Sequence, residues 1–242
     1  MKVIDKNRVG VPDDLEAGWV LVVDKPPGWS SSDVVRKIKF RMRSKGYRKI
    51  KVGHAGTLDP LATGVLLVCL GRATKRVEEL QAERKEYVTD IVLGATTPSY
   101  DMEHPVDRTY PHEHIDREMI DRALEGLCGE RLQTPPLYSA KMIDGRRAYE
   151  YAREGSEVEL RRALIEIYSM IVESYDHPTV RVRIECSKGT YIRSIARELG
   201  EALGSGAYLS SLRRTASGGH RVEEALSLEE TIKFLEEINM AD

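Results

Sequence analysis

The sequence predicts an α+β domain built around a mostly antiparallel or mixed sheet that helices flank. Apolar runs of strand length and segments with helical periodicity follow one another along the 242 residues, without an internal repeat or a low-complexity linker. The segment Thr179 to Cys186 alternates apolar and charged residues, as a half-solvated antiparallel strand does. This length is ample for one sizeable core, so we expect a single domain over residues 1–242.

The first part of the chain predicts a buried strand, a turn and a basic amphipathic helix. The apolar run Trp19 to Val23 indicates the strand, and the Pro-Pro-Gly sequence after Lys25 indicates the turn. One of the serines at positions 30 to 32 can cap the helix, which Gly46 ends. The apolar stripe of this helix consists of Val34, Val35, Ile38 and Met42.

The later elements follow from the same two periodicities. Further strands are expected at residues 49–53, 65–70, 86–93, 163–175 and 179–186. Further helices are expected at residues 73–81, 115–127, 146–153, 192–203 and 228–238, and Thr190 is the expected cap of the fourth. Turn residues and polar residues fill segments 53–64 and 98–114, so both are expected as loops.

Composition favours a soluble, cytoplasmic protein without a metal site. The N-terminal stretch Met1 to Asp14 is polar and lacks the apolar segment of a signal peptide. No apolar run approaches the ~20 residues that a membrane-spanning helix needs. The three cysteines are scattered among apolar residues, so we expect buried, reduced thiols and no zinc site at Cys69, Cys128 and Cys186.

Charge is unevenly distributed although the formal net charge is only −2. The segment from Asp33 to His54 holds nine basic residues and one acid, whereas the segment from Glu223 to Asp242 is strongly acidic. A nearly neutral chain can therefore present a basic face to phosphate groups. From charge alone, a merely solvated basic helix is the simpler interpretation.

Several common chemistries have no motif in this sequence. There is no phosphate-binding loop, no dinucleotide fingerprint and no nucleophile elbow, so we expect no nucleotide, metal or redox cofactor. The remaining candidate is the loop GHAGTLDPLATG, residues 53–64, whose glycines permit close approach of a ligand. Taken alone, Asp59 would be a turn residue and His54 a structural or surface histidine.

Six blocks of sequence change that interpretation. They are GWVLVVDKPPGWSS (18–31), VGHAGTLDPLATGVLLVCLGRATK (52–75), KEYVTDIVLG (85–94), PPLYSAKMIDGRRAYEYAREG (135–155), CSKGTYIRSIARELGEAL (186–203) and LSSLRR (209–214). With these blocks in this order, the chain resembles the bacterial tRNA pseudouridine-55 synthases, the TruB family, over nearly its whole length. The motifs are long and specific.

The resemblance implies the pseudouridine-synthase fold, with a long bent mixed sheet and an active-site cleft across it. It also implies a reaction on a uridine flipped out of the tRNA T-loop. The glycosidic C–N bond is broken, the base is turned, and it is rejoined through C5. This reaction is an isomerisation, which agrees with the lack of cofactor motifs.

The resemblance also assigns roles to single residues. Asp59 matches the essential aspartate, which acts as a carboxylate on the ribose or base by a covalent or a glycal route. Arg193 matches the arginine that pairs with this carboxylate. Tyr87 matches the tyrosine that stacks on the uracil and helps to remove the C5 proton. Tyr191 and Leu212 match positions that line the uracil pocket.

The expected partner is the T-arm of tRNA. His54 matches a histidine that contacts the T-loop and fills the space of the flipped base, which offsets part of the cost of base flipping. The basic helix would bind the RNA backbone. The phosphate-binding candidates are Arg36, Lys37, Lys39, Arg43 and Lys51. No membrane and no nucleotide cofactor are expected, and we expect a monomer.

The chain departs from the family pattern at four places. Ala55 replaces a common threonine, and Met142 stands where a lysine is usual, with Lys141 one place earlier. Residues 98–103 replace an acidic, threonine-rich turn. The sequence ends soon after Ile238, so we expect no separate C-terminal RNA-binding domain.

Two alternatives to a standalone tRNA-modifying enzyme stay open at this point. One is a tRNA-folding factor whose main role is non-catalytic, and the other is a guide-RNA-dependent relative. The presence of four residues that the resemblance places in the active site favours the enzyme over pure binding. These residues are Asp59, Tyr87, Tyr191 and Arg193.

Overall fold

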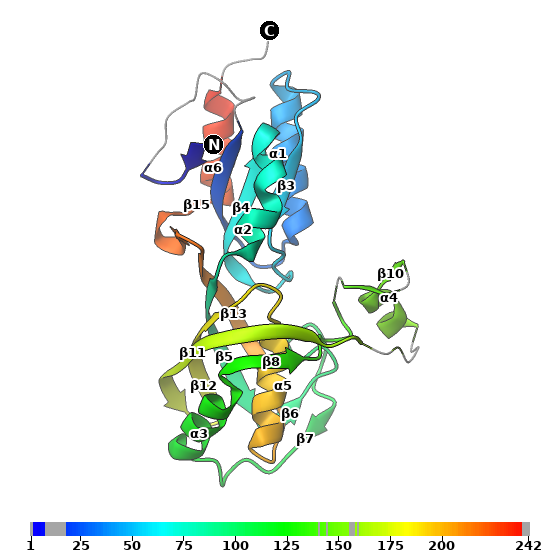
Figure 1. Ribbon diagram of the computed structural model, residues 1–242, viewed down its shortest axis with the longest axis vertical. Coiled ribbons are helices and arrows are strands. Elements are labelled where there is room, and N and C mark those ends of the chain that lie inside the picture. The colour runs from blue at the N-terminus through cyan, green and yellow to red at the C-terminus, as the bar shows by residue number, and fades with distance from the viewer. Residues whose placement is uncertain are drawn as a thin grey trace. The chain divides into compact units, whose positions relative to one another are not determined.

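The computed structural model describes residues 2–7, 18–139, 141–143, 145–154, 158 and 160–238. The chain forms two compact units (Figure 1). Unit 1 consists of residues 1–87 and 213–242, and unit 2 consists of residues 88–212. The boundaries lie within two strands, β5 (Lys85–Leu93) and β13 (Ala207–Ser217), so each of these strands contributes residues to both units.

Unit 1 contains strands from both ends of the sequence. Its complete strands are β1 (Lys2–Ile4), β2 (Trp19–Lys25), β3 (Val52–Ala55), β4 (Thr63–Leu70), β14 (His220–Arg221) and β15 (Leu226–Ser227). Its α-helices are α1 (Ser31–Ser44), α2 (Val77–Ala82) and α6 (Leu228–Glu237). Two 3₁₀ segments, Gly71–Arg76 and Val222–Glu224, complete the unit.

Strand β2 is buried on both faces, which explains its nearly continuous apolar sequence. Val20 and Val22 belong to a core cluster that includes Leu80 of α2. The Trp19 ring packs against Phe234 of α6, with ring centroids 6.4 Å apart. Helices α1 and α6 are in contact, and α6 also contacts β2 (Figure 1). Strand β2, which ends at Lys25, is therefore packed against other elements on both of its faces.

Among the described residues, unit 2 has seven strands of its own and three helices. Its strands, besides the shared ones, are β6 (Ala95–Thr96), β7 (Arg108–Thr109), β8 (Gly129–Gln133), β9 (Met142–Ile143), β10 (Arg146–Arg147), β11 (Ala163–Asp176) and β12 (Thr179–Cys186). Its helices are α3 (Arg117–Leu127), α4 (Ala148–Arg153) and α5 (Ile192–Ala202). Helix α3 packs against both α5 and β11.

The main sheet is mixed, which confirms the predicted fold class. In unit 1 the strand order is β1-β2-β4-β13, with β2 antiparallel to β4 and β4 parallel to β13. In unit 2 the order is β13-β5-β12-β11-β8, and both β12 and β8 are antiparallel to β11. Strand β5 alternates buried and half-buried residues along its whole length, as the sequence pattern indicates.

Four expectations about local structure need correction. His54 lies in β3, because residues 52–55 pair with β4, so the loop begins at Gly56. Thr190 does not cap α5; its hydroxyl donates to Ser187 O at 3.0 Å, and Tyr191 is the N-cap residue. Residues 73–81 form a 3₁₀ turn followed by α2. Cys128 is exposed at the end of α3, whereas the other two cysteines are buried.

The sequence pattern also missed strands β8 and β13. Their sequences, GERLQ and AYLSSLRRTAS, are rich in polar and charged residues, so neither shows a clear apolar period. In β13 the buried positions include an arginine, Arg214, which binds backbone carbonyls. No helix in the described part of the chain is long and apolar enough to cross a bilayer.

Candidate active site

The loop between β3 and β4 presents Asp59 on a backbone fixed from several directions. The Leu58 amide donates to Ser31 Oγ at 2.8 Å, and this hydroxyl donates to Leu58 O at 3.1 Å. The Gly28 amide donates to Pro60 O at 2.9 Å, and the Ala62 amide closes a turn onto Asp59 O at 3.1 Å. Because both neighbours of Asp59 are tied to the start of α1 or to the turn before it, the backbone that carries the carboxylate is preorganised.

A buried lysine lies under this loop. Lys25 has no exposed surface, and its ammonium donates to Pro26 O at 2.9 Å, Trp29 O at 2.5 Å and Pro60 O at 3.1 Å. Burial lowers the pKa of the Lys25 ammonium to about 8, and the nearby Asp59 carboxylate opposes this fall. Since the interaction of two charges is mutual, the ammonium in turn favours negative charge on Asp59.

Arg214 of β13 adds a second buried cation in unit 1. Its Nε donates to Val65 O at 2.7 Å and its Nη2 to Gly56 O at 3.1 Å. The residue at position 64 must be glycine here, because a Cβ on Gly64 would lie 2.1 Å from Arg214 O and φ is +100°. The absence of a side chain lets β4 and β13 approach closely at the end of the loop.

His54 reaches the same region from β3. Burial lowers the pKa of the His54 imidazole, and the Arg214 guanidinium lowers it further. Near neutral pH the ring is therefore uncharged and acts as a flat, largely apolar surface. Such a ring suits contact with a base more than contact with a phosphate group.

In unit 2, polar groups of residues 133 and 134 fix the start of α5, which contains Tyr191 and Arg193. The Gln133 side chain accepts from Tyr191 N at 2.8 Å and donates to Tyr191 O at 3.2 Å. Ser194 Oγ donates to Thr134 O at 2.8 Å. These bonds fix the first turn of a helix whose N-cap side chain makes no capping bond.

Arg193 is only 3% exposed, and the loop after β6 binds its guanidinium. Its Nη1 donates to Ser99 O at 3.1 Å, and its Nε lies 3.6 Å from the Asp101 carboxylate. This carboxylate also accepts from Ser99 Oγ at 2.6 Å and from Glu103 N at 3.0 Å. Tyr100, which lies between Ser99 and Asp101 in the sequence, has a φ of +62°, an uncommon conformation for a residue other than glycine.

Two further predicted site residues lie on the shared strands. Tyr87 is 8% exposed on the buried face of β5, and Leu212 is half-buried on β13. Asp59, His54 and Tyr87 belong to unit 1, whereas the remaining pocket residues belong to unit 2. The roles that the family pattern gives to these side chains stay predictions.

The basic residues in and near α1 differ in their exposure and in their partners. Arg36, Lys37 and Arg43 are exposed, and Arg36 pairs with Asp33 at 3.1 Å. Lys39 is half-buried, and Lys51 is exposed just before β3. Arg41, which is not among the predicted RNA contacts, is bound by Glu236 of α6 at 2.6 Å.

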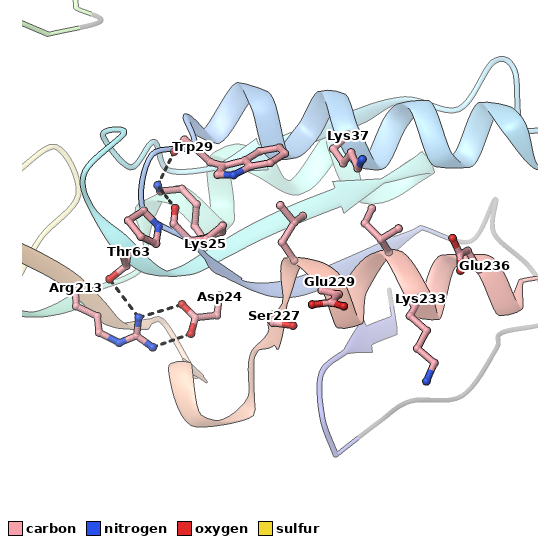
Figure 2. A pocket seen from close by; sticks show the side chains of 14 residues that line it. Asp24, Lys25, Trp29, Lys37, Thr63, Arg213, Ser227, Glu229, Lys233 and Glu236 are labelled. Atoms are coloured by element: carbon pink, nitrogen blue, oxygen red, sulfur yellow. Dashed lines mark hydrogen bonds and ion pairs between the residues drawn. The ribbon is translucent and has the colours of Figure 1, made fainter.

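A groove of about 910 Å³ lies between the turn after β2 and helix α6 (Figure 2). Lys25, Trp29 and Lys37 line one part of it, and residues of α6 line another. Figure 2 shows Arg213 directed toward Asp24, which accepts two hydrogen bonds from it, at 2.7 and 3.1 Å. The groove contains charges of both signs, and Asp59 does not line it.

The residues that the sequence analysis missed are the buried partners of the predicted ones. Lys25 lies at the end of β2, directly before the predicted turn, and its position close to a long apolar run is the one signal of a buried charge. Asp101 lies in a segment that had been noted only as a departure from the family pattern. Gln133 and Arg214 lie in the two strands that lack a clear apolar period. No group of potential metal ligands occurs among the described residues.

Two solved structures share the fold of this chain. A crystal structure of a Cbf5–Nop10–Gar1 complex matches with a TM-score of 0.69 and 32% identity, over 90% of this chain and 54% of that chain. An H/ACA RNP bound to a substrate RNA containing 2′-deoxyuridine matches with a TM-score of 0.66 and 29% identity, over 90% of this chain and 53% of that chain. The chain thus spans about half the length of these structures.

The sequence comparisons identify the family. Residues 42–192 match the TruB family pseudouridylate synthase N-terminal domain. The chain is 49% identical to tRNA pseudouridine synthase B of Phocaeicola vulgatus over 225 residues. This stretch covers 93% of this chain and 96% of that relative. It is 50% identical over 230 residues to tRNA pseudouridine synthase B of Bacteroides fragilis, 95% of this chain and 97% of that relative. The chain belongs to the TruB family of pseudouridylate synthases.

Proposed function

We propose that this protein isomerises uridine 55 in the T-loop of tRNA to pseudouridine. The similarity to tRNA pseudouridine synthase B over nearly the whole of each chain supports tRNA as the substrate. The single observation that carries the chemistry is the Asp59 carboxylate on a loop whose backbone is fixed on both sides and rests on the Lys25 ammonium. A fixed, negatively charged carboxylate is what either route of this isomerisation requires.

In the proposed reaction, the C1′–N1 bond of the flipped uridine breaks, and a bond from C1′ to C5 forms after the base has turned. The C5 proton leaves and N1 gains a proton, so atoms and electrons balance without a cofactor. Asp59 acts on the ribose or base, and Arg193 supports its charge. Tyr87 stacks on the uracil and assists removal of the C5 proton, whereas Tyr191 and Leu212 line the pocket. His54 replaces the stacking of the flipped base.

The proposal includes binding of the T-arm by the basic residues of unit 1, as a monomer in the cytoplasm. Arg36, Lys37 and Arg43 are exposed on α1, and Lys51 is exposed beside β3, so all four are available to phosphates. Lys39 is half-buried and has less freedom to reach the RNA. These contacts position the RNA, whereas the pocket selects the base.

The test is release of tritium from an unmodified tRNA transcript labelled at uridine C5, without a cofactor. The wild type should release one tritium per tRNA, and none when uridine 55 is replaced. Asp59→Asn should reduce the rate by at least ~10³-fold, because an amide lacks the charge of the carboxylate. The matched control is Asp121→Asn, an exposed aspartate of α3 that pairs with Arg117 and should release tritium normally.

Tritium release, measured together with tRNA binding, decides between the enzyme and the folding factor. The Asp59→Asn variant should bind tRNA with a Kd within about threefold of the wild type, because binding depends mainly on phosphate contacts. Normal turnover by Asp59→Asn would contradict the assignment of the carboxylate. Tight tRNA binding without tritium release by the wild type would instead support a non-catalytic tRNA-folding role.

A further inference from the structure

The exposed face of α1 has an aromatic residue at its centre. The buried face of the helix contains Val34, Ile38 and Met42. At 100° per residue, Phe40 points to the opposite side of the helix from Ile38. Phe40 is 71% exposed and is one of only two phenylalanines in the chain. A large aromatic side chain thus lies where helical patterning calls for a polar one.

Cationic side chains surround this ring on the same face. Arg36 lies four residues before Phe40, Lys37 three before it, and Arg43 three after it, which are the spacings of neighbours on a helix surface. All three are exposed. Two acids near this face are already paired: Asp33 binds Arg36 at 3.1 Å, and Glu236 of α6 binds Arg41.

An exposed ring among cations matches the chemistry of an unpaired nucleotide. A base offers a flat apolar surface to stack on the ring, and the flanking phosphates offer negative charge to the arginines and the lysine. Stacking on an aromatic side chain contributes about 1–3 kcal/mol per base. An isolated exposed apolar residue would have no such consequence, but the three cations give this one a ligand of defined charge.

We propose that Phe40 stacks on an unpaired base of the substrate RNA, other than the uridine that is isomerised, while Arg36, Lys37 and Arg43 bind the adjacent phosphates. The proposal rests on the proposed function only in taking tRNA as the substrate. It adds a specific base contact to a helix whose other contacts would be to the RNA backbone alone. Phe40 therefore contributes to binding and not to the chemical step.

The test compares Phe40→Ala, Phe40→Tyr and Arg43→Gln with the wild type in tRNA binding over a range of salt concentrations. Phe40→Ala should raise the Kd by roughly tenfold without changing the salt dependence, because stacking releases no counterions. Phe40→Tyr should bind like the wild type. Arg43→Gln should weaken binding and lower the slope of log K against log salt by about 1.

The matched control is Leu164→Ala, which shortens another exposed apolar side chain, 66% exposed on β11, and should leave the Kd unchanged. As a direct probe, the fluorescence of Phe40→Trp, after subtraction of the wild-type signal, should be quenched when tRNA binds. At saturating tRNA, Phe40→Ala should release tritium at the wild-type rate.

Different results would overturn the inference and the proposed function. Wild-type affinity of Phe40→Ala, or an equal loss for Leu164→Ala, would exclude a base contact at Phe40 while the isomerase activity of the wild type still stood. A wild type that binds tRNA but releases no tritium would overturn the proposed function, and a specific loss in Phe40→Ala would still support the stacking contact. A wild type that does not bind tRNA would overturn both.

Discussion

Two buried cations fix the loop that presents the Asp59 carboxylate. Lys25 binds three carbonyl oxygens, one of them directly after Asp59, and its charge favours the ionised carboxylate. Arg214 closes the other end of the loop at Gly56. Burying two cations is costly, but each donates to several carbonyls, so the cost is partly offset and the loop backbone is fixed.

Replacing Lys25 tests this arrangement through stability. We expect Lys25→Met to lower the free energy of unfolding by about 2 kcal/mol at pH 7, because three carbonyls lose their donor. The folded pKa, about 8, lies below the ordinary value of 10.5. The unfolded chain therefore holds this proton more tightly between these values, and the stability of the wild type gains from Lys25 as the pH rises through that window.

The difference between wild type and Lys25→Met should therefore be larger at pH 9.5 than at pH 7, with a slope of up to ~1.4 kcal/mol per pH unit. Guanidinium chloride unfolding of both proteins at the two pH values measures it. Lys233→Met, which removes an exposed lysine of α6, should change the stability by less than ~0.5 kcal/mol at either pH. An equal difference at pH 7 and pH 9.5 would show that Lys25 is not perturbed by burial.

At the scale of elements, α1 combines three tasks on one helix. Its buried stripe packs in unit 1, Ser31 in its first turn holds Leu58, and its opposite face presents basic residues. Ser30 caps the helix together with Asp33, as the run of serines predicted. The neighbouring α6 pairs its Glu236 carboxylate with Arg41, and Glu236 O accepts from Lys45 Nζ, so the basic surface available to RNA is smaller than the sequence suggests.

Glu236→Gln should free Arg41 of α1 for contact with RNA. Arg41 would lose its carboxylate partner, and we expect tRNA to bind about threefold more tightly at low salt, with a salt slope steeper by about 1. Stability should change by less than ~1 kcal/mol, because both partners are partly exposed. The measurement is a tRNA titration at several salt concentrations.

The control for this prediction is Glu237→Gln, which changes the net charge by the same amount at the next, exposed position. A gain in affinity of the same size in both variants would mean that only the total charge matters. That result would contradict release of Arg41 as the cause.

The elements that the sequence predicted well are those with a strong period. Helix α1, strand β2 and strand β12 each follow an uninterrupted apolar pattern, and all three were placed within a few residues. Strand β13 was missed because its interior includes Arg214, which is buried only because Val65 O and Gly56 O lie beside it. No local pattern reveals such partners when they lie 149 and 158 residues away in the sequence.

At the scale of the whole molecule, the candidate site was predictable only in part. The family motifs indicated Asp59 and Arg193 as site residues, and the roles of both stay predictions. They did not indicate Lys25 under the Asp59 loop or Asp101 beside Arg193, which act by holding other groups. Such positioning residues depend on contacts between distant segments, so they become visible only in the folded chain.

The expectation of a single domain predicts how the molecule unfolds. Strands β5 and β13 each contribute residues to both units, so neither unit can lose these strands without disturbing the other. We therefore expect one cooperative transition in denaturant. Both tryptophans, Trp19 and Trp29, belong to unit 1, so their fluorescence reports that unit, whereas far-UV circular dichroism reports the helices and strands of both.

The two signals should give the same midpoint and the same dependence on denaturant concentration. A fluorescence transition separate from the transition in circular dichroism would mean that the units unfold independently and that the chain is better described as two domains. Adding tRNA sharpens the measurement, because a ligand that binds only the native protein stabilises every part that unfolds with its site. In a single domain, tRNA shifts both transitions equally, whereas in two independent domains it shifts them by different amounts.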